Sequence, residues 1–437
     1  MTVEVDRISN LPNGILAHIL SFVSTKEAIH ACILSKTWKY IWTAVPTLEF
    51  DFRKFCHDHR VLDGNIKEYE AKYVQFVEGV MLNREALLLD TFKLNWFNYD
   101  CHQYYTPKSV TEVIPRALKF KPRVLSVNFH LDNCENLDID SIFNSDSLED
   151  VHLSCNYDLK KFAPNSINLP HLKNLKLLRQ GIGRDFLNKL FLECPVLEEL
   201  TLCNCALNFD KIYFNILKKL IVVDCHRAKE VEKLEIITPS LLYLEIERCY
   251  GLTKVSASNM LSLVDASIEF GWYELDGVVI GGSEPNFLGS LSNVTSLHVI
   301  VECEIKTLLI ICCNFHMMEK LKNGASNCPT FNNLKRLSIL WRVDYNFDLI
   351  AFFLYNSPNL EDITLLDEIF SENASPNLGL EEPKYDLSRR EHLETVTILN
   401  CCKISSETLD LLSNSVCEFR YLHINIGIYV FLLPIFI

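Results

Sequence analysis

A six-residue pattern of apolar positions, apolar-x-x-apolar-x-apolar, recurs along most of this 437-residue chain. The copies begin at Leu89, Val124, Leu148, Leu172, Leu197, Leu217, Leu241, Leu263, Val294, Leu334, Leu360 and Leu393. Apolar residues that alternate over so short a stretch are typical of a strand with one buried face. A single repeated unit cannot bury that face alone, so neighbouring units stack on each other. The pattern therefore predicts a solenoid with one strand in every unit.

The ninth position of the repeated unit indicates which kind of repeat this is. Leucine-rich repeats prefer Asn or Cys there, and their period is about 20 to 29 residues. This chain has Asn156, Cys205, Cys225, Cys249 and Cys401 at that position. Such repeats form a parallel sheet on one face, while helices or irregular turns cover the other. We therefore predict an α/β fold, a horseshoe of leucine-rich repeats, in which four of the cysteines have a structural role.

Two parts of the repeat region depart from the regular pattern. The hexad at Leu263 is weak because Ala266 fills its second apolar position. The interval of 40 residues after Val294 exceeds one ordinary repeat, and a helix is expected within it from Lys306 to Lys322. Loops are expected at residues 281–283 and 371–380.

The first fifty residues carry a helical pattern instead. Pro12 stands where a helix can begin, and apolar residues follow it at helical spacing. Thr25 can cap a second helix and Ser35 a third, which Pro46 ends. Three helices in about 45 residues bury too little apolar surface to be stable alone. Part of the apolar surface of this module should therefore contact a partner.

The same segment resembles an F-box. The similarity lies in Leu11-Pro12, Ile15-Leu16, Ile19-Leu20-Ser21-Phe22, Lys26-Glu27-Ala28 and Leu34-Ser35-Lys36, followed by Trp38 and Trp42. In that family the module binds a small Skp-type adaptor, which connects it to a cullin scaffold and to the ubiquitin-conjugating enzyme. By position, the resemblance implies adaptor contacts for Leu11, Pro12, Ile15, Leu16, Ile19, Leu20, Leu34, Ser35, Lys36, Trp38 and Trp42.

Two departures from the F-box pattern bear on adaptor binding. Gly14 stands where the family usually has an acid, so a favourable carboxylate is missing from a helix N-terminus. Val23-Ser24 replaces the usual Leu-Pro pair. Both changes are expected to weaken the adaptor contact without abolishing it. The alternative interpretation of the segment is a plain three-helix cap on the solenoid.

The repeats resemble those of plant F-box proteins with leucine-rich repeats, through Cys194–Leu200 and Ser357–Glu361. From about Phe331 onward, Glu391–Val396 and Glu407–Leu412 resemble the FBD domain that often ends such proteins. The expected organisation is an F-box at 1–50, a helical linker at 51–88 with an amphipathic helix at 67–83, leucine-rich repeats at 89–330, FBD-like repeats at 331–425 and an apolar tail at 426–437. The tail departs from the FBD pattern, because an apolar run stands in place of an amphipathic terminal element. It is also more apolar than the polar surface that normally ends a solenoid.

The composition of the chain limits which classes of binding partner and which cellular compartments we expect. The formal net charge of −14 disfavours binding to nucleic acid and to anionic membranes. The N-terminus lacks the apolar segment of a secretory signal, and the longest apolar run is shorter than the roughly 20 residues of a membrane-spanning helix. The 17 cysteines are expected to be reduced thiols. We expect a protein of the cytoplasm, the nucleus or both, with no nucleic-acid or membrane partner.

The chain has no strong catalytic or metal-binding motif. Zinc-ligand residue types occur in Cys203, Cys205 and Cys225-His226 and in doublets at 312–313 and 401–402, but no paired C-x-x-C motif accompanies them. A P-loop, a G-x-G-x-x-G loop and a G-x-S-x-G elbow are missing. The histidines in or beside hexads are interpreted as surface or packing residues: His130, His152 and His298. We expect no catalytic residues, no metal and no other cofactor.

These features predict the substrate-recognition subunit of a Skp–cullin–F-box ubiquitin ligase, not an enzyme, whose repeats hold an unidentified substrate protein. Every second hexad residue should point to the open face of the sheet. In the central repeats these residues are Glu199, Lys219, Tyr243, Glu245, Glu247, Asp265 and Glu269. This acidic stripe is either a docking surface for a basic substrate segment or ordinary solvated surface. The alternative function is a repeat scaffold that acts outside a ligase because its F-box is weakened.

Overall fold

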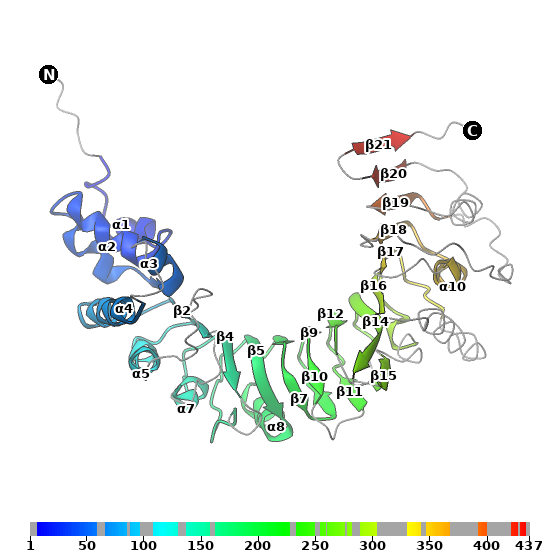
Figure 1. The fold of residues 1–437 in the computed structure, drawn as a ribbon, viewed down its shortest axis with the longest axis horizontal. Helices are drawn as coiled ribbons and strands as arrows, with labels where there is room; N and C mark the ends of the chain where they lie inside the picture. Colours follow the sequence, from blue (N-terminus) through cyan, green and yellow to red (C-terminus); the bar gives the residue numbers. More distant parts are fainter. Residues whose placement is uncertain are drawn as a thin grey trace. The chain divides into compact units, whose positions relative to one another are not determined.

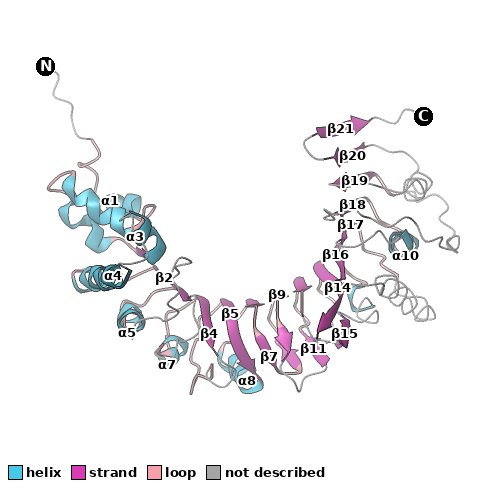
Figure 2. Cartoon of the chain, viewed as in Figure 1, coloured by secondary structure: helices cyan, strands magenta, loops and turns pink. Residues whose placement is uncertain are grey.

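The computed structural model is drawn as a ribbon in Figure 1. Its residues form two compact units, Met1–Asn208 and Phe209–Ile437. The residues that the structure describes are 7–58, 66–84, 88–96, 108–129, 137–157, 162–227, 233–249, 254–258, 260–275, 278–281, 289–303, 330–341, 347–367, 392–399, 421–426 and 429–433. Helices predominate in the first module, and strands follow in both units (Figure 2).

The N-terminal module has its helices where the sequence predicts them. They are α1 (Asn13–Leu20), α2 (Thr25–His30) and two 3₁₀ helices, η1 (Ala31–Ile33) and η2 (Trp38–Ala44). The predicted third helix is therefore 3₁₀ in type and begins at Trp38, with Thr37 and not Ser35 at the N-cap position. The predicted cap Thr25 is also wrong, because Ser24 is the N-cap of α2. Thr25 is buried, and its hydroxyl accepts a hydrogen bond from the backbone N–H of Glu49 at 2.7 Å.

A strand that the sequence pattern missed follows the module directly. β1 (Thr47–Asp51) buries Leu48 and Phe50 and precedes α3 (Phe52–Asp58) and α4 (Ile66–Leu82). The expected helix at 67–83 is thus confirmed as α4. Pro46 conceals the hexad that begins at Val45, because a proline after a helical pattern is read as a helix stop. The parallel sheet therefore starts within the range assigned to the F-box.

The joint between module and sheet is pinned by hydrogen bonds. The carbonyl of Pro46 accepts from the backbone N–H groups of Asp90 and Thr91, at 2.8 and 3.2 Å. The buried guanidinium of Arg84 donates from Nη1 to the carbonyl of Val45 at 2.7 Å and from Nη2 to that of Leu88 at 2.7 Å. Burial lowers the pKa of Arg84 to about 10. Arg84 therefore supplies hydrogen-bond donors to two backbone carbonyls at this joint.

The first unit continues as a stretch of α/β solenoid. After β1, its strands are β2 (Thr91–Trp96), β3 (Val124–Phe129), β4 (Asp150–Tyr157), β5 (Asn174–Gly183), β6 (Glu199–Cys203) and β7 (Ala206–Asn208). Strands β1 to β6 pair in parallel in chain order, and β7 pairs in parallel with the end of β5. Helices lie along one side of these strands (Figure 1): α5 (Lys108–Thr111), α6 (Val113–Leu118), α7 (Ile139–Phe143) and α8 (Arg184–Glu193). Between helices and sheet, the rings of Phe143, Phe162 and Phe186 meet edge to face.

The register of β3 corrects one predicted hexad. Phe92 pairs with Leu125 and Leu94 with Val127, so the equivalent hexad begins at Pro122 and not at Val124. The two registers are hard to distinguish from sequence, because strict alternation produces the same apolar pattern two residues later. The other hexads begin two residues before their strands, as predicted.

The second unit repeats the same parallel arrangement. Its main strands pair in the order β9 (Lys219–Val223), β12 (Tyr243–Glu247), β14 (Asp265–Leu275), β16 (Ser296–Cys303), β17 (Arg336–Trp341), β18 (Asp362–Asp367), β19 (Thr395–Leu399) and β20 (Tyr421–Ile426). The weak hexad with Ala266 is a genuine strand, since Ala266 is buried in β14.

Further strands lie beside that main sheet. A second parallel sheet consists of β8 (Lys211–Tyr213), β11 (Lys233–Ile237) and β13 (Lys254–Ser258). The remaining described elements are β10 (His226–Arg227), α10 (Phe347–Asn356), β15 (Val278–Gly281), antiparallel to β14, and β21 (Tyr429–Leu433), antiparallel to β20. The expected apolar tail at 426–437 therefore contains the paired strand β21. The expected helix at 306–322 and the loop at 371–380 lie outside the described residues.

Candidate functional site

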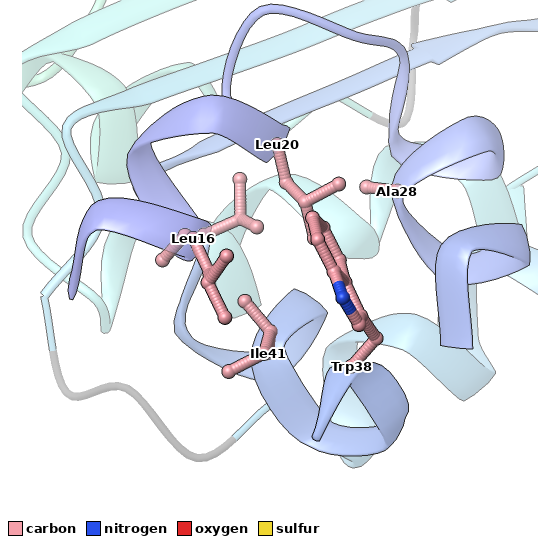
Figure 3. Close-up of a cluster of buried hydrophobic side chains, with 7 residues drawn as sticks. Leu16, Leu20, Ala28, Trp38 and Ile41 are labelled. Carbon is pink, nitrogen blue, oxygen red and sulfur yellow. The ribbon is translucent and has the colours of Figure 1, made fainter. Parts of the chain in front are cut away.

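The N-terminal module has one small core. Its buried members come from α1, α2, η2 and the residue after η2 (Figure 3): Leu16, Ala17, Leu20, Ala28, Trp38, Ile41 and Val45. The indole of Trp38 lies across this core and is 6% exposed. Its Nε1 donates a hydrogen bond to the hydroxyl of Ser9 at 2.9 Å, and that hydroxyl lies 3.2 Å from the hydroxyl of Ser35. Trp38 thus connects the residues before α1 to the residues before η2.

The start of α2 explains one departure from the F-box pattern. The Ser24 hydroxyl accepts from the backbone N–H of Glu27 at 3.3 Å, and the Glu27 carboxylate accepts from the backbone N–H of Ser24 at 2.9 Å. This reciprocal capping box satisfies two backbone donors at the helix start. Ser24 therefore gives α2 a favourable N-terminus, although the usual Leu-Pro pair of the F-box pattern is missing.

Outside its core, the module exposes many large apolar side chains. We call them the apolar module surface: Ile8, Ile15, Ile19, Phe22, Val23, Ile33, Leu34 and Tyr40. The exposed fraction reaches 77% for Phe22, 82% for Ile33 and 72% for Leu34. Scattered exposed apolar residues are normal, but this density within 33 residues is typical of an interaction site.

The predicted adaptor-facing residues divide into three groups. Pro12, Ile15, Ile19, Leu34 and Lys36 are exposed, whereas Leu11, Ser35 and Trp42 are partly buried. The third group, Leu16, Leu20 and Trp38, lies in the module core and is at most 6% exposed. The side chains of these three residues are packed inside the module, and their direct contact with an adaptor stays a prediction. Helical spacing cannot tell which apolar residues face a core and which face a partner.

The charge of the module differs from that of the whole chain. Residues 7–46 contain four basic side chains, Arg7, Lys26, Lys36 and Lys39, against one acidic side chain, Glu27. The complete chain has a formal net charge of −14. Long-range electrostatic attraction toward the module therefore favours an acidic partner.

The predicted substrate stripe is partly assembled in the second unit. Parallel register places Tyr243 between Lys219 and Asp265 on neighbouring strands. The Tyr243 hydroxyl donates to the Glu245 carboxylate at 2.7 Å, and the Lys219 ammonium lies 5.5 Å from the centre of the Tyr243 ring. Burial, and then the hydrogen bond to Glu245, raises the pKa of Tyr243 above its usual range. Tyr243 is therefore held in place by its own neighbours.

Other acids of the stripe are less available. The Glu247 carboxylate accepts from the Ser267 hydroxyl at 2.6 Å and lies 3.7 Å from the Arg248 guanidinium. Glu269 accepts from the backbone N–H of Arg248 at 2.9 Å and is 4% exposed, so its predicted place on the accessible face is wrong. Glu269 follows the hexad that begins at Leu263, in the part of the eleven-residue strand β14 that extends beyond the hexad. Glu199 belongs to the first unit, where it is exposed.

Two of the three histidines noted in or beside hexads lie in described strands and behave as packing residues. His152 and His298 are partly buried, and burial lowers the pKa of each imidazole below its ordinary value. Each imidazole is therefore neutral at pH 7. The third histidine of this set, His130, lies outside the described residues.

Three of the four ninth-position thiols have the predicted structural role, and the fourth, Cys401, lies outside the described residues. Cys205, Cys225 and Cys249 each donate to backbone carbonyls near the end of a strand, at 3.4 Å. Gln180 occupies the same position and donates from Nε2 to the carbonyls of Cys155 and Leu178. The sequence prediction missed Gln180, although its ninth position was the available signal.

The residue before each of these turns has an unusual backbone. The eighth positions Arg179, Asn204, Asp224 and Arg248 have φ between 47° and 59°. This left-handed conformation is uncommon for residues other than glycine, and Asn and Asp tolerate it best. The side chains of Arg248 and Asp224 form an ion pair at 2.5 Å across adjacent repeats. Together, the eighth and ninth positions define how the chain leaves each strand.

Among the described residues, no three His, Cys, Asp or Glu side chains are grouped as ligands of one metal ion. The doublets at 312–313 and 401–402 lie outside those residues. Over the same part of the chain, no helix combines the length and the apolar character needed to cross a bilayer.

Known protein families match the two parts of the chain in order. Residues 8–49 match the F-box domain, and residues 123–265 match the family described as FBD-associated F-box protein At5g56370, LRR repeats.

In Arabidopsis thaliana, the putative F-box protein At1g58310 is 28% identical over 431 residues, which cover 91% of this chain and 81% of the relative. The F-box/LRR-repeat protein At3g59200 is 28% identical over 83% of this chain and 69% of its own length. The F-box/FBD/LRR-repeat protein At1g78750 is 25% identical, covering 90% and 83%. By these matches the chain is similar to F-box proteins with leucine-rich repeats of the FBD-associated type.

Proposed function

We propose that this protein is the substrate-recognition subunit of a Skp–cullin–F-box ubiquitin ligase. The apolar module surface is the observation that carries the proposal, because Phe22, Ile33 and Leu34 are each more than 70% exposed. A fully buried side chain of this size contributes about 1.5–3 kcal/mol of hydrophobic free energy. The Skp-type adaptor is the partner that would cover this surface and connect the protein to a cullin.

The role of the chain in the reaction is to position a substrate. Ubiquitin transfer would take place on other subunits, and the repeats would hold the substrate protein within reach. Holding two reactants in the right geometry converts a bimolecular step into an effectively unimolecular one. The F-box and the repeats would thus perform binding steps only.

Adaptor binding is tested with exposed residues, since changes in the module core would also unfold it. The double variant Ile33→Ala, Leu34→Ala should bind a purified Skp-type adaptor at least tenfold more weakly in isothermal titration calorimetry. Leu192→Ala is the matched control, because Leu192 is 70% exposed on α8, outside the module. Equal affinities of the double variant and the wild type would contradict the proposed adaptor surface.

For the substrate, we propose that the accessible part of the stripe binds a basic segment. Lys219, Tyr243, Glu245 and Asp265 remain partly exposed, and Tyr243 offers an aromatic anchor at their centre. Tyr243→Ala combined with Glu245→Lys should reduce ubiquitination of substrates that the wild type captures under proteasome inhibition. Tyr213→Ala, at an exposed tyrosine on β8, should not. If both variants capture and ubiquitinate the same substrates normally, substrate recognition lies elsewhere.

A weakened F-box is the alternative that one feature favours. The N-cap of α1 is Pro12, which provides no side-chain hydrogen bond, and the first turn of α1 contains no acidic residue. A scaffold of this kind would form no cullin complex in cells. Co-purification of the tagged protein with a cullin, compared with the Ile33→Ala, Leu34→Ala variant, distinguishes the two functions.

A further inference from the structure

The first unit contains a cavity where the F-box module meets the first strands. Its volume is about 760 Å³, within the range of about 300–1,000 Å³ that is common for small-molecule sites. Side chains from α2, β1, α3, α4, β2 and β3 line it. A molecule bound there would contact a helix of the F-box and the start of the repeats at the same time.

Asn95, one of the residues that line this cavity, has a side-chain oxygen without a hydrogen-bond donor among the described residues. The Asn95 side chain donates from Nδ2 to the Asp51 carboxylate at 2.9 Å. A carboxylate can only accept, so this bond fixes the orientation of the amide and leaves Oδ1 on the other side. Asn95 Oδ1 is buried and has no hydrogen-bond partner among the described residues. Leaving such a group unsatisfied costs about 1–3 kcal/mol.

A second polar atom is the hydroxyl of Tyr73, whose side chain also lines the cavity. Tyr73 is 1% exposed, and its hydroxyl has no hydrogen-bond partner within the described part of the chain. Burial, followed by the nearby negative charge of Asp51, raises the pKa of Tyr73 above its usual range. The hydroxyl is therefore protonated, and it can both donate and accept.

The remaining lining determines the class of ligand. Phe55 and Phe76 supply aromatic walls, and their rings pack at 5.1 and 6.5 Å from the Tyr73 ring. The charged residues that line the cavity are three cations and three anions: Lys26, Arg53, Lys54, Glu27, Glu49 and Asp51. Equal numbers of both signs give no net preference for an anion or a cation. The acids already accept hydrogen bonds or form an ion pair: Glu27 from Ser24, Asp51 from Lys54 and Asn95, and Glu49 with Lys54.

We propose that this cavity binds an uncharged aromatic small molecule that carries an N–H or O–H group. The ring packs against Phe55 and Phe76, and the ligand donates a hydrogen bond to Asn95 Oδ1. The Tyr73 hydroxyl forms the second hydrogen bond to the ligand. A hydroxyl on the ligand can serve both atoms, since it donates one hydrogen bond and accepts others.

Binding is measured on the full-length protein by ligand-observed NMR with three naphthalene probes. 2-Naphthol is uncharged and has a hydroxyl, 2-methoxynaphthalene cannot donate a hydrogen bond, and 2-naphthoate is an anion. 2-Naphthol should bind at least fivefold more tightly than either of the others, because one neutral hydrogen bond contributes roughly a factor of five. Absence of 2-naphthol binding, or equal binding of the three probes, overturns the proposal.

Tyr73→Phe tests the site without removing the ring. Its affinity for 2-naphthol should fall about fivefold relative to the wild type, whereas Tyr213→Phe in the second unit should leave the affinity unchanged. The melting temperature of Tyr73→Phe without ligand should stay the same or rise, because an unsatisfied buried hydroxyl is lost. A purely structural hydroxyl would give the opposite result, a lower melting temperature with unchanged 2-naphthol affinity, and this outcome overturns the assignment.

Discussion

The F-box module and the strands of the repeats bury their apolar residues to different extents. In the strands, alternate residues such as Leu175 and Leu177 are at most 1% exposed, because neighbouring repeats bury them. In the module, Leu16 is buried at 0%, yet Ile15 beside it is 49% exposed and Ile33 is 82% exposed. A repeat is completed by its neighbours within the chain. The module is left incomplete, as expected of a domain that a second protein completes.

The largest expected effect is loss of the module core. Trp38→Ala should destabilise the module by about 3–5 kcal/mol, because it removes a large side chain that is 6% exposed. A core this small cannot absorb that loss. Hydrogen exchange with mass spectrometry should show residues 7–46 losing protection while β3 to β6 keep theirs. Tyr40→Ala, at an exposed position in η2, serves as the control, and unchanged exchange in Trp38→Ala would contradict the comparison.

A similar change inside a strand should act on the repeats instead. Leu177→Ala leaves a cavity at a fully buried position in β5 and should cost about 2–5 kcal/mol. Urea denaturation followed by far-ultraviolet circular dichroism measures this loss. Leu192→Ala on α8 should change the free energy of unfolding by no more than about 0.5 kcal/mol. Equal effects of the two changes would mean that the strand interior is not the main core.

Gly14→Glu should strengthen the module by about 1 kcal/mol. Gly14 is exposed near the start of α1, and a Cβ added there meets no atom within 4 Å. The gain combines better helix propensity than glycine with a carboxylate near the helix N-terminus. Gly14→Gln separates the two contributions, because it supplies the side chain without the charge. Slower hydrogen exchange in α1 measures the gain, and no difference between the Glu and Gln variants would exclude the electrostatic part.

The smallest expected effect concerns an exposed ion network in the first unit. Glu149 forms ion pairs with Arg123 at 2.8 Å and Lys173 at 2.9 Å, and hydrogen bonds from Arg123 and then Lys173 lower the pKa of Glu149 to about 2. A lowered carboxyl pKa stabilises the folded state above the ordinary value of 4.5, and this contribution disappears as the pH falls from 4.5 to about 2. The urea midpoints of wild type and Glu149→Gln should therefore differ slightly at pH 7 and converge near pH 2. A constant difference over this pH range would contradict the assignment.

The sequence predicts the strands well because one local signal specifies them. A hexad buries its alternate residues wherever repeats stack, so even the weak copy at Ala266 forms a strand. The hexad pattern predicts the wrong register at Val124, where alternating apolar residues fit two registers equally well. It misses the strand β1, because Pro46 interrupts the pattern there. These errors concern the register and the start of the sheet, and not its existence.

The candidate sites are harder to predict, because burial and pairing depend on residues far apart in sequence. Trp38 has the spacing of an adaptor contact, but Ser9 and the helices around it place it in the core. Glu269 has the spacing of an open-face residue and is nevertheless buried. The cavity at Tyr73 and Asn95 has no sequence signature, since it combines six elements that only the fold brings together.

The pinned joint after Val45 has a mechanical consequence. A swivel needs a stretch of backbone whose hydrogen-bonding groups are free to exchange partners with water. Here the carbonyls of Val45 and Pro46 are instead held by Arg84, Asp90 and Thr91, and β1 begins at the next residue. Torque applied to the F-box module would therefore pass directly into β1 and β2. The module and the first strands should therefore rotate together as one rigid body. A flexible linker at this joint would not determine how far a bound substrate can move from the module.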